Sequence, residues 1–328
     1  MGGKALKTIQ TRRYNKDEFE KVKILVGNFN LFSQGRIHVV DCYFEKETFG
    51  DIDVLVEMTS ENSVENILKN IKYNEIHRNG NVVSFDVNNN FQCDLIKVKS
   101  EDWLFAKVFY AYNDLGLILG RMTRNLGFTF GFDGLKYKVY SANKTSKLGE
   151  IFLTKNPQEA FEFLDLNWNR FLKGFNTMTD VFDYVFTSKF AVARLFDKDF
   201  QNSSNKRKDA KRQSVTLAEK YVKLHNDTIS YQVSSEFKDN IVEILNNQFP
   251  KVNLKIQIQK LYSNYDNEKL ASEIFSANDI MNLIKDLQGA KLGQILNLFK
   301  KRFNNYTMER ILYGKEIMQQ LFLKFYDS

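Results

Sequence analysis

The sequence predicts an α+β protein with a mixed β-sheet and flanking helices, followed by a mostly helical carboxy-terminal region. Two observations carry this prediction. Before residue 100, short apolar runs are separated by turn-forming residues, a pattern typical of strands. From about Asp102 the apolar side chains return to helical spacing, and residues 150–328 mostly keep it.

The amino-terminal elements follow from the same spacing. Residues 15–34 are predicted to form a helix, because their apolar positions recur with a period near 3.6. Residues 37–40 then form a short apolar strand, and residues 52–56 a second strand. A helix at 61–72 precedes a hairpin, VVSFDV-NNN-FQCDLIKV, whose turn consists of the asparagines 88–90.

The carboxy-terminal half is predicted to be helical with two interruptions. One is the polar, basic stretch NSSNKRKDAKRQS at 202–214, and the other is a loop-like segment at Phe249-Pro250. A soft boundary near residue 170 divides the chain into domains 1–170 and 171–328.

Composition limits the class of protein. The chain has 328 residues, which is long enough for two domains, and its net charge of +7 favours a polyanionic partner. Cys42 and Cys93 are too few for a disulfide scaffold, so a reducing, cytoplasmic location is expected. No window approaches the roughly 18 apolar residues of a membrane span, so no membrane partner is expected.

A pair of carboxylates marks the second strand. In GDIDVLV, Asp51 and Asp53 are separated by one residue, so both leave the same face of a strand while Ile52 and Val54 pack on the other. Two such charges raise each other's pKa unless a cation lies between them, and Mg²⁺ takes carboxylates together with phosphate oxygens. A D-x-D pair by itself is more often a solvated strand or turn pair, so its surroundings decide its meaning.

The surroundings favour a site. Gly50, directly before the pair, permits a tight turn and a close backbone approach to a phosphate, and the following VLV indicates a buried strand. On the second strand of the hairpin, Asp94 shares a face with Gln92. Asp86 competes for the role of third acid, but an Asp beside a turn more often caps a loop, so we prefer Asp94.

Three acids on adjacent strands would hold two divalent cations, Mg²⁺ or Mn²⁺, about 4 Å apart. One ion would lower the pKa of an attacking hydroxyl, and the other would neutralise a leaving pyrophosphate. The catalytic and metal-binding residues predicted on this basis are Asp51, Asp53 and Asp94.

At this point the chain resembles a known superfamily. A strand, a polar turn, then G-D-h-D-h-h-h (h is apolar) and later an Asp in an apolar strand form the signature of DNA polymerase β-like nucleotidyltransferases. IHVVDCYFEKETFGDIDVLVE followed by FQCDLIKV is similar to it. YAYNDLGLILGRMTRNLGFTFGFDGLKYK and IFLTKNPQEAFEFLDL resemble the thumb of family X DNA polymerases. The resemblance covers residues 35–168 and implies a nucleotidyltransferase palm, a nucleoside triphosphate substrate and a catalytic domain at 1–170.

The chain departs from this family at the triphosphate site. The Gly-Ser that follows the first strand of the family and binds the triphosphate is replaced by Val-Asp-Cys at 40–42, with Lys46 the nearest cation. Gly-Gly-Lys at residues 2–4 offers backbone donors instead, although an extreme amino terminus is more often frayed. The expected phosphate-binding residues are therefore Gly50 and Lys46.

The family X motif that senses the sugar corresponds to VFYAYND in this chain. The resemblance makes Tyr110, Tyr112 and Asn113 candidates to contact the base or sugar of the nucleotide. Aromatic residues in such a position are core at least as often as ligand platforms, so both roles stay open.

A run of cations lies in the stretch at 202–214 and is the first choice for contacts with a nucleic-acid backbone, since such a run neutralises phosphates without reading sequence. A solvated loop without a partner is the alternative. The run comprises Lys206, Arg207, Lys208, Lys211 and Arg212. The second choice comprises Lys300, Lys301 and Arg302.

Near its end the chain also resembles the carboxy-terminal element of CCA-adding tRNA nucleotidyltransferases, in FSANDIMNLIKDLQGAKLGQILNLFKKRF. The alternative is local: Ser276 or Asn278 caps a helix and Gly289 ends one. The paired Asp and Arg with which CCA enzymes select C and A are absent.

Three functions remain open at this stage. The first is transfer of nucleotides to the 3′-hydroxyl of a nucleic acid, either a tRNA or RNA 3′ end or a DNA end, with 171–328 as a nucleic-acid-binding domain. The second is nucleotide transfer to a protein or small molecule. The third is a non-catalytic nucleic-acid-binding protein on the same fold.

Overall fold

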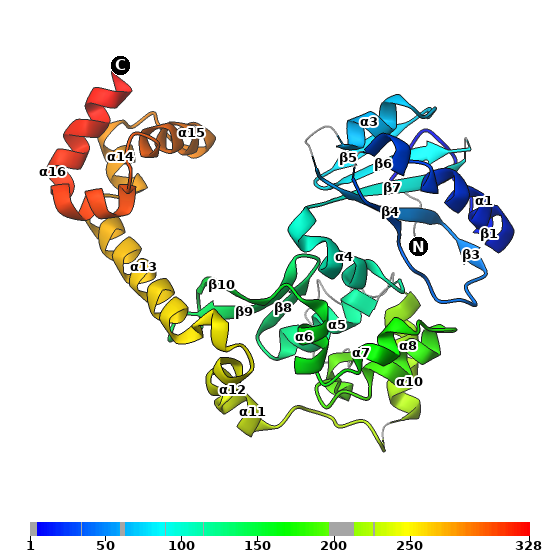
Figure 1. Cartoon of the computed structure of the whole chain (residues 1–328). Helices are drawn as coiled ribbons and strands as arrows, with labels where there is room; N and C mark the ends of the chain where they lie inside the picture. Colours follow the sequence, from blue (N-terminus) through cyan, green and yellow to red (C-terminus); the bar gives the residue numbers. More distant parts are fainter. Residues whose placement is uncertain are drawn as a thin grey trace. The chain divides into compact units, whose positions relative to one another are not determined.

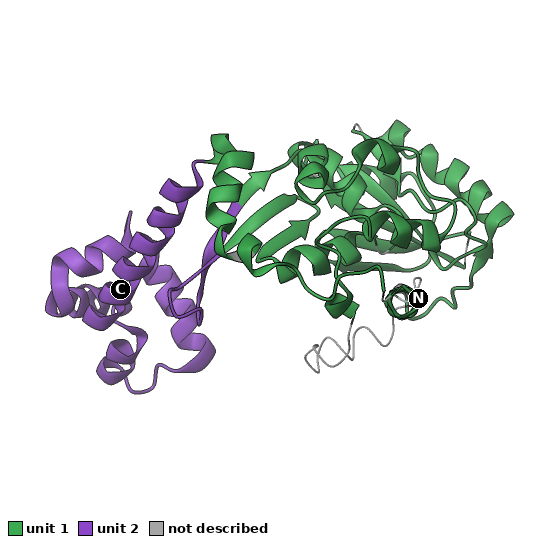
Figure 2. Ribbon diagram, turned by 90° about the horizontal axis from the view of Figure 1, so that it is seen from below, with its two compact units in different colours: residues 1–138, 152–252 green, residues 139–151, 253–328 purple. Residues whose placement is uncertain are grey.

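The computed structural model describes residues 5–33, 35–59, 63–88, 90–113, 115–196, 213–225 and 227–328. The chain divides into two units, shown in green and purple in Figure 2. Unit 1 comprises Met1–Lys138 with Phe152–Val252, and unit 2 comprises Val139–Ile151 with Asn253–Ser328. The predicted domain boundary near residue 170 stays a prediction.

Unit 1 begins with a five-stranded sheet of strand order β2-β4-β7-β6-β5 (Figure 1). Its strands are β2 (Ile37–Val39), β4 (Asp51–Glu57), β5 (Ile76–Asn79), β6 (Val82–Val87) and β7 (Phe91–Val98). β4 and β7 run parallel, whereas the other neighbours are antiparallel, so the predicted mixed sheet is confirmed. The predicted hairpin is also confirmed: Asn88 lies in its turn with a φ of 51°, a conformation that Asn tolerates better than most residues.

The two faces of this sheet differ in what covers them. Helices α1 (Lys16–Gly27) and α3 (Ser63–Lys69) pack on one face, where the strand residues Ile52, Val54 and Val56 join the apolar core. The other face carries Asp51, Asp53 and Leu55, because side chains alternate along a strand. On that face Leu55 packs with Trp103 and Ala106 of α4 (Trp103–Tyr110).

The predicted helix at 15–34 is present but divided. Asn15 accepts the N–H of Glu18, and the Glu18 carboxylate accepts the N–H of Asn15, so a capping box fixes the start of α1. α1 ends at Gly27, and the short α2 (Asn30–Ser33) follows. Before α1, β1 (Tyr14–Asn15) pairs with β3 (Thr48–Phe49), which joins the amino-terminal segment to the chain leading into β4.

The remainder of unit 1 combines helices with part of a second sheet, two of whose strands continue into unit 2. The sheet has the order β10-β9-β8, and its strands are β8 (Phe128–Gly131), β9 (Gly134–Tyr140) and β10 (Lys147–Thr154). The helices are α5 (Leu115–Asn125), α6 (Pro157–Phe163), α7 (Trp168–Leu172), α8 (Met178–Val185), α10 (Gln213–Leu224), α11 (Ser235–Asp239) and α12 (Ile241–Gln248). Phenylalanines from several of these elements contact one another: the Phe130 and Phe161 ring centroids are 6.3 Å apart and those of Phe161 and Phe171 are 5.0 Å apart. Aromatic side chains therefore form much of this core.

Unit 2 consists of the end of the β9–β10 hairpin and four helices (Figure 1). They are α13 (Leu254–Ile274), α14 (Ala277–Leu283), α15 (Gly289–Lys300) and α16 (Tyr306–Tyr326). Tyr262 of α13 donates its hydroxyl to the Tyr140 carbonyl at 2.8 Å, which holds the hairpin to the helix. The mostly helical carboxy-terminal region is thus confirmed.

The helix ends in unit 2 show which of the predicted caps are present. Ser276 caps α14 in a capping box with Asp279, as the local alternative predicts. Gly289, with a φ of 58°, is the first residue of α15 and does not end a helix. Within the described residues, no helix is both long and apolar enough to span a membrane.

Candidate functional site

The predicted acids meet on one face of the five-stranded sheet. In the parallel β4–β7 pair, Asp53 stands opposite Asp94 and Asp51 stands opposite Gln92. On the other side of β7, Ser84 of β6 stands opposite Asp94. Because neighbouring residues in register project to the same face, the Asp51, Asp53 and Asp94 side chains all lie on the face opposite α1 and α3.

Burial and like charge both act on this group of acids. Burial, followed by the charges of Asp51 and Asp94, raises the pKa of Asp53 to about 8, against an opposing effect of Lys46. Burial also raises the pKa of Asp94 to about 6, although hydrogen bonds from Ser84 and Gln92 favour its charged form. Carboxyls that hold protons this strongly are short of positive charge, and a bound cation would supply it.

Gln92 positions the Asp94 carboxylate directly. Its Nε2 donates to both Asp94 oxygens, at 2.8 and 3.0 Å, and its side chain is buried, with the residue 2% exposed. The Gln92 Oε1 in turn accepts the backbone N–H of Ala5 at 2.8 Å. The amide orientation is therefore fixed by a donor on one side and an acceptor on the other.

Lys46 is the cation of the site. It lies in the chain between β2 and β4, its Nζ donates to Asn113 Oδ1 at 2.9 Å, and it stands 4.8 Å from the centre of the Phe49 ring. Burial lowers the pKa of Lys46, and the charges of Asp51 and Asp53 partly offset this effect. The structure thus brings Lys46, Asn113 and the acid pair together.

The other residues of the predicted nucleotide site have different surroundings. Tyr112 is buried, its ring packs edge-on against Phe175 with centroids 4.8 Å apart, and its N–H donates to the Asp41 carbonyl at 2.7 Å. Of the two roles left open by the sequence, core residue and ligand platform, the packing of this ring corresponds to the core residue. Gly50 is buried directly before β4, where β3 leads into the acid strand. Tyr110 packs against the cluster that contains Leu55 and Trp103, and burial, with a smaller contribution from the charge of Asp53, raises its pKa.

Asp86 holds a loop. Its Oδ1 accepts the backbone N–H groups of Asn74 and Glu75 at 2.8 and 2.7 Å, and its Oδ2 accepts the Asn74 side-chain amide at 2.8 Å. Burial raises the pKa of Asp86, but these hydrogen bonds outweigh it and lower the pKa overall. Through these hydrogen bonds Asp86 therefore holds the segment before β5 and not the asparagine turn that follows it in the sequence.

The predicted nucleic-acid contacts are only partly described. The run Lys206, Arg207, Lys208, Lys211 and Arg212 lies outside the described residues, and so does Gly-Gly-Lys at 2–4. The second choice lies in unit 2, where Lys300 ends α15 and stands 5.6 Å from the Tyr306 ring centre. The Arg302 guanidinium stands 4.7 Å from the Phe325 ring centre. Lys300, Lys301 and Tyr326, the last residue of α16, are exposed.

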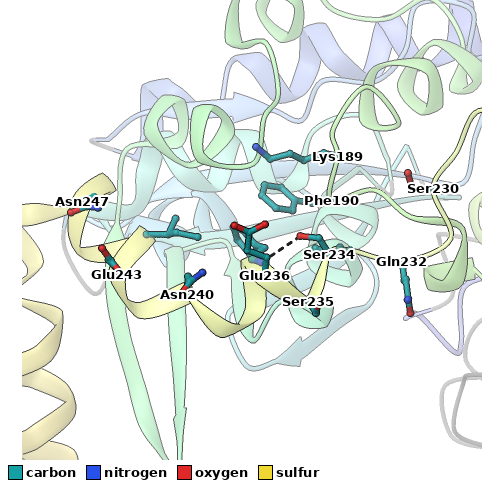
Figure 3. Close-up of a pocket in the computed structure, with 13 residues that line it drawn as sticks. Lys189, Phe190, Ser230, Gln232, Ser234, Ser235, Glu236, Asn240, Glu243 and Asn247 are labelled. Carbon is teal, nitrogen blue, oxygen red and sulfur yellow. Dashed lines mark hydrogen bonds between the residues drawn. The ribbon is translucent and has the colours of Figure 1, made fainter.

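A separate groove of about 1060 Å³ lies in unit 1, where Lys189 and Phe190 face helices α11 and α12 (Figure 3). Glu236, Asn240 and Glu243 are among the residues that line it. The Phe190 and Phe237 ring centroids are 4.7 Å apart beside it. None of its lining residues belongs to β4, β6 or β7, so the groove is distinct from the acid face.

Two contributors to the site were not predicted. Ser84 requires knowledge of the strand register, which a single sequence does not contain. The contact of Gln92 with Asp94 could have been predicted, because the two residues are two positions apart and share a strand face. No sequence pattern indicates the contact of Gln92 with Ala5.

In the described part of the chain, no three His, Cys, Asp or Glu side chains are already arranged as a metal-binding group. Comparison with models of known protein families finds no match, and comparison with curated proteins finds no significant one.

Proposed function

We propose that this protein is a metal-dependent nucleotidyltransferase that adds nucleotides from nucleoside triphosphates to the 3′-hydroxyl of a nucleic acid. The observation that carries the proposal is the register of β4 and β7, which sets Asp53 opposite Asp94 on the face that also carries Asp51. Carboxylates grouped in this way, with raised pKa values and a lysine beside them, suit chemistry on a phosphate bound with a divalent cation.

The donor set fits Mg²⁺ or Mn²⁺ in chemical type. Asp51, Asp53 and Asp94 offer only oxygen ligands, which hard divalent cations prefer, and their mutual repulsion is relieved when positive charge enters. When bound there, such ions would lower the pKa of an attacking hydroxyl and stabilise the charge of a leaving pyrophosphate.

The remaining residues of the site have roles that follow from their contacts. Gln92 orients the Asp94 carboxylate through two hydrogen bonds. Lys46 supplies a positive charge for a phosphate group, and Asn113 accepts from its Nζ and so limits where that charge can lie. The buried β4 backbone under the acids keeps them on a rigid element, which phosphoryl transfer requires.

The nucleic-acid substrate is supported by charge. The chain carries a net charge of +7, and its basic residues include the run at 206–212 and the Lys300-Lys301-Arg302 cluster. Phosphate contacts of this kind position a strand without reading its sequence. The proposal therefore assigns chemistry to the acid face and strand positioning to these cations.

The proposal is tested by incubating the protein with labelled single-stranded RNA, gapped DNA or tRNA lacking its 3′ end, each nucleoside triphosphate, and Mg²⁺ or Mn²⁺. We expect one of the strands to lengthen in wild type and none to lengthen in the Asp51→Asn, Asp53→Asn double variant. Label that enters a protein or a small molecule and leaves every strand unextended would instead support the second class of transfer. Equal incorporation by wild type and the double variant would rule out the acid face as the catalytic site.

A further inference from the structure

The amino-terminal segment 5–9 is tied to a distant carboxylate. Glu75 Oε1 accepts the N–H of Lys7 at 2.7 Å, and Oε2 accepts the N–H groups of Thr8 and Ile9, each at 2.8 Å. The Thr8 hydroxyl also donates to Oε2, at 2.6 Å. One carboxylate thus fixes three consecutive peptide groups, a rigid arrangement for a segment outside regular secondary structure.

Glu75 is itself held by the sheet. Its own backbone N–H donates to Asp86 Oδ1 at 2.7 Å, and Asp86 is buried in β6. The anchor for segment 5–9 is therefore connected to a strand that pairs with β7.

Ala5, the first residue of segment 5–9, contacts the acid site. Ala5 donates its N–H to Gln92 Oε1 at 2.8 Å, and the Leu6 side chain next to it is buried. A glutamine amide can rotate by half a turn with little change in shape, which would exchange its donor and acceptor. The Ala5 N–H prevents this exchange, because it requires an acceptor on its side and so leaves Nε2 facing Asp94.

We propose that Glu75 is a positioning residue of the acid site, which acts by holding segment 5–9 so that the Ala5 N–H fixes the Gln92 amide against Asp94. The proposal rests on the proposed function in so far as Asp94 is a metal ligand. Without the anchor, the Gln92 amide is held by Asp94 alone, so the Asp94 carboxylate is positioned less firmly for a cation.

The test compares Glu75→Ala and Gln92→Leu, singly and together, with Glu65→Ala as the control. Glu65 of α3 is a matched control because its carboxylate forms a bidentate pair, at 2.8 and 2.9 Å, with Arg78 of β5 in the same sheet. Three quantities are measured on each full-length variant: kcat and KM for the nucleotide, binding of Mn²⁺ alone by calorimetry, and hydrogen exchange of the amides of residues 5–9.

Glu75→Ala is expected to accelerate exchange at residues 5–9, to weaken Mn²⁺ binding and to lower kcat by about tenfold, as loss of support for a metal ligand does, while KM changes little. Gln92→Leu is expected to lower kcat similarly, and the double variant no further, because both changes interrupt one chain of contacts. Glu65→Ala should leave all three quantities at wild-type values.

The outcomes separate this proposal from the proposed function. If Glu75→Ala releases the segment but leaves Mn²⁺ binding and kcat unchanged, or if exchange at residues 5–9 stays slow, the positioning role is wrong. Additive losses in the double variant would also contradict it. If wild type transfers no nucleotide yet binds Mn²⁺ in a Glu75-dependent manner, the positioning role stands and the proposed function fails. If wild type neither transfers nor binds, both are wrong.

Discussion

Two regions of the molecule bury charge in opposite ways. In unit 2, the buried Arg310 donates to the Phe275 carbonyl at 3.0 Å and to Glu268 at 2.6 Å, and it lies 4.7 Å from the Tyr306 ring centre. On the acid face of unit 1, Asp53 has the like charges of Asp51 and Asp94 beside it, opposed by Lys46.

The difference separates a structural charge from one arranged for a ligand. Arg310 joins α16 to the end of α13, because folding gives its Nη1 a carbonyl acceptor and its Nη2 a carboxylate of opposite charge. Burial, together with the like charges nearby, raises the pKa values of Asp53 and Asp94, so folding alone disfavours their charged forms and a cation would stabilise them. Removing Arg310 should therefore cost stability, and removing an acid should cost activity.

The largest expected effect is on the acid face. Asp53→Asn should lower nucleotide transfer more than about a hundredfold, about 2.7 kcal/mol of transition-state stabilisation, because the shared cation loses a ligand. Its Tm should stay equal or rise, since a like charge has been removed. Asp86→Asn is the comparison in steady-state kinetics and thermal unfolding, and it should retain more activity. A variant that kept more than about a tenth of wild-type turnover at saturating Mg²⁺ would remove Asp53 from the metal site.

The opposite effect is expected in unit 2. Arg310→Met should lower the free energy of unfolding by about 2 kcal/mol, because the Phe275 carbonyl and Glu268 lose a buried, charged donor. Urea denaturation measures the loss. Lys315→Met, which removes an exposed partner of Asp279, should cost under about 1 kcal/mol. Equal losses of unfolding free energy in Arg310→Met and Lys315→Met would contradict the structural role of Arg310.

Lys46 lies between these extremes, since it is a partly buried cation held by a single described hydrogen bond to Asn113. Lys46→Ala should lower kcat/KM for the nucleoside triphosphate about tenfold, about 1.4 kcal/mol, through loss of a phosphate contact. Lys23→Ala, at the surface beside Glu20, is the control and should match wild type. An unchanged kcat/KM would show that the triphosphate is bound elsewhere.

The last expected effect is the pH dependence of stability. The folded pKa values of Asp53 and Asp94, about 8 and about 6, lie above the ordinary value of 3.8. Raised carboxyl pKa values contribute stability that is fully present below the ordinary pKa and is lost as pH rises through the folded values. Urea denaturation in EDTA from about pH 4 to 8 should show this fall, and Mg²⁺ should reduce it. A wild-type profile parallel to that of Asp53→Asn would disprove the assignment.

Local patterns predicted most of the fold. Alternation in GDIDVLV assigned Asp51 and Asp53 to one face, and the asparagine turn marked the β6–β7 hairpin. The mixed sheet and the helical carboxy-terminal region follow from changes in apolar spacing. These features depend on neighbouring residues, which a sequence displays directly.

Long-range contacts were beyond such patterns. That β7 and not β6 pairs with β4 depends on tertiary packing, and it decides that Asp94 stands opposite Asp53. The contacts of Glu75 with Lys7, Thr8 and Ile9 join backbone groups to a side chain far along the chain, and backbone groups carry no sequence signal. The aromatic ring of Tyr112 could not be assigned to core or ligand until Phe171 and Phe175 were seen around it.

The parallel pairing of β4 and β7 has a consequence for folding. Parallel neighbours need a crossover, and here the crossover includes α3, β5 and β6. β6 and β7 can pair through a short local turn, whereas β4 meets β7 only after this longer loop has closed, which is entropically slower. Asp51 and Asp53 also precede Asp94 in the chain, so they are synthesised first. A nascent chain that ends before β7 has two of the acids without the third. A divalent cation that needs all three would act on the chain only after the sheet has formed, and it would stabilise the finished fold without nucleating it.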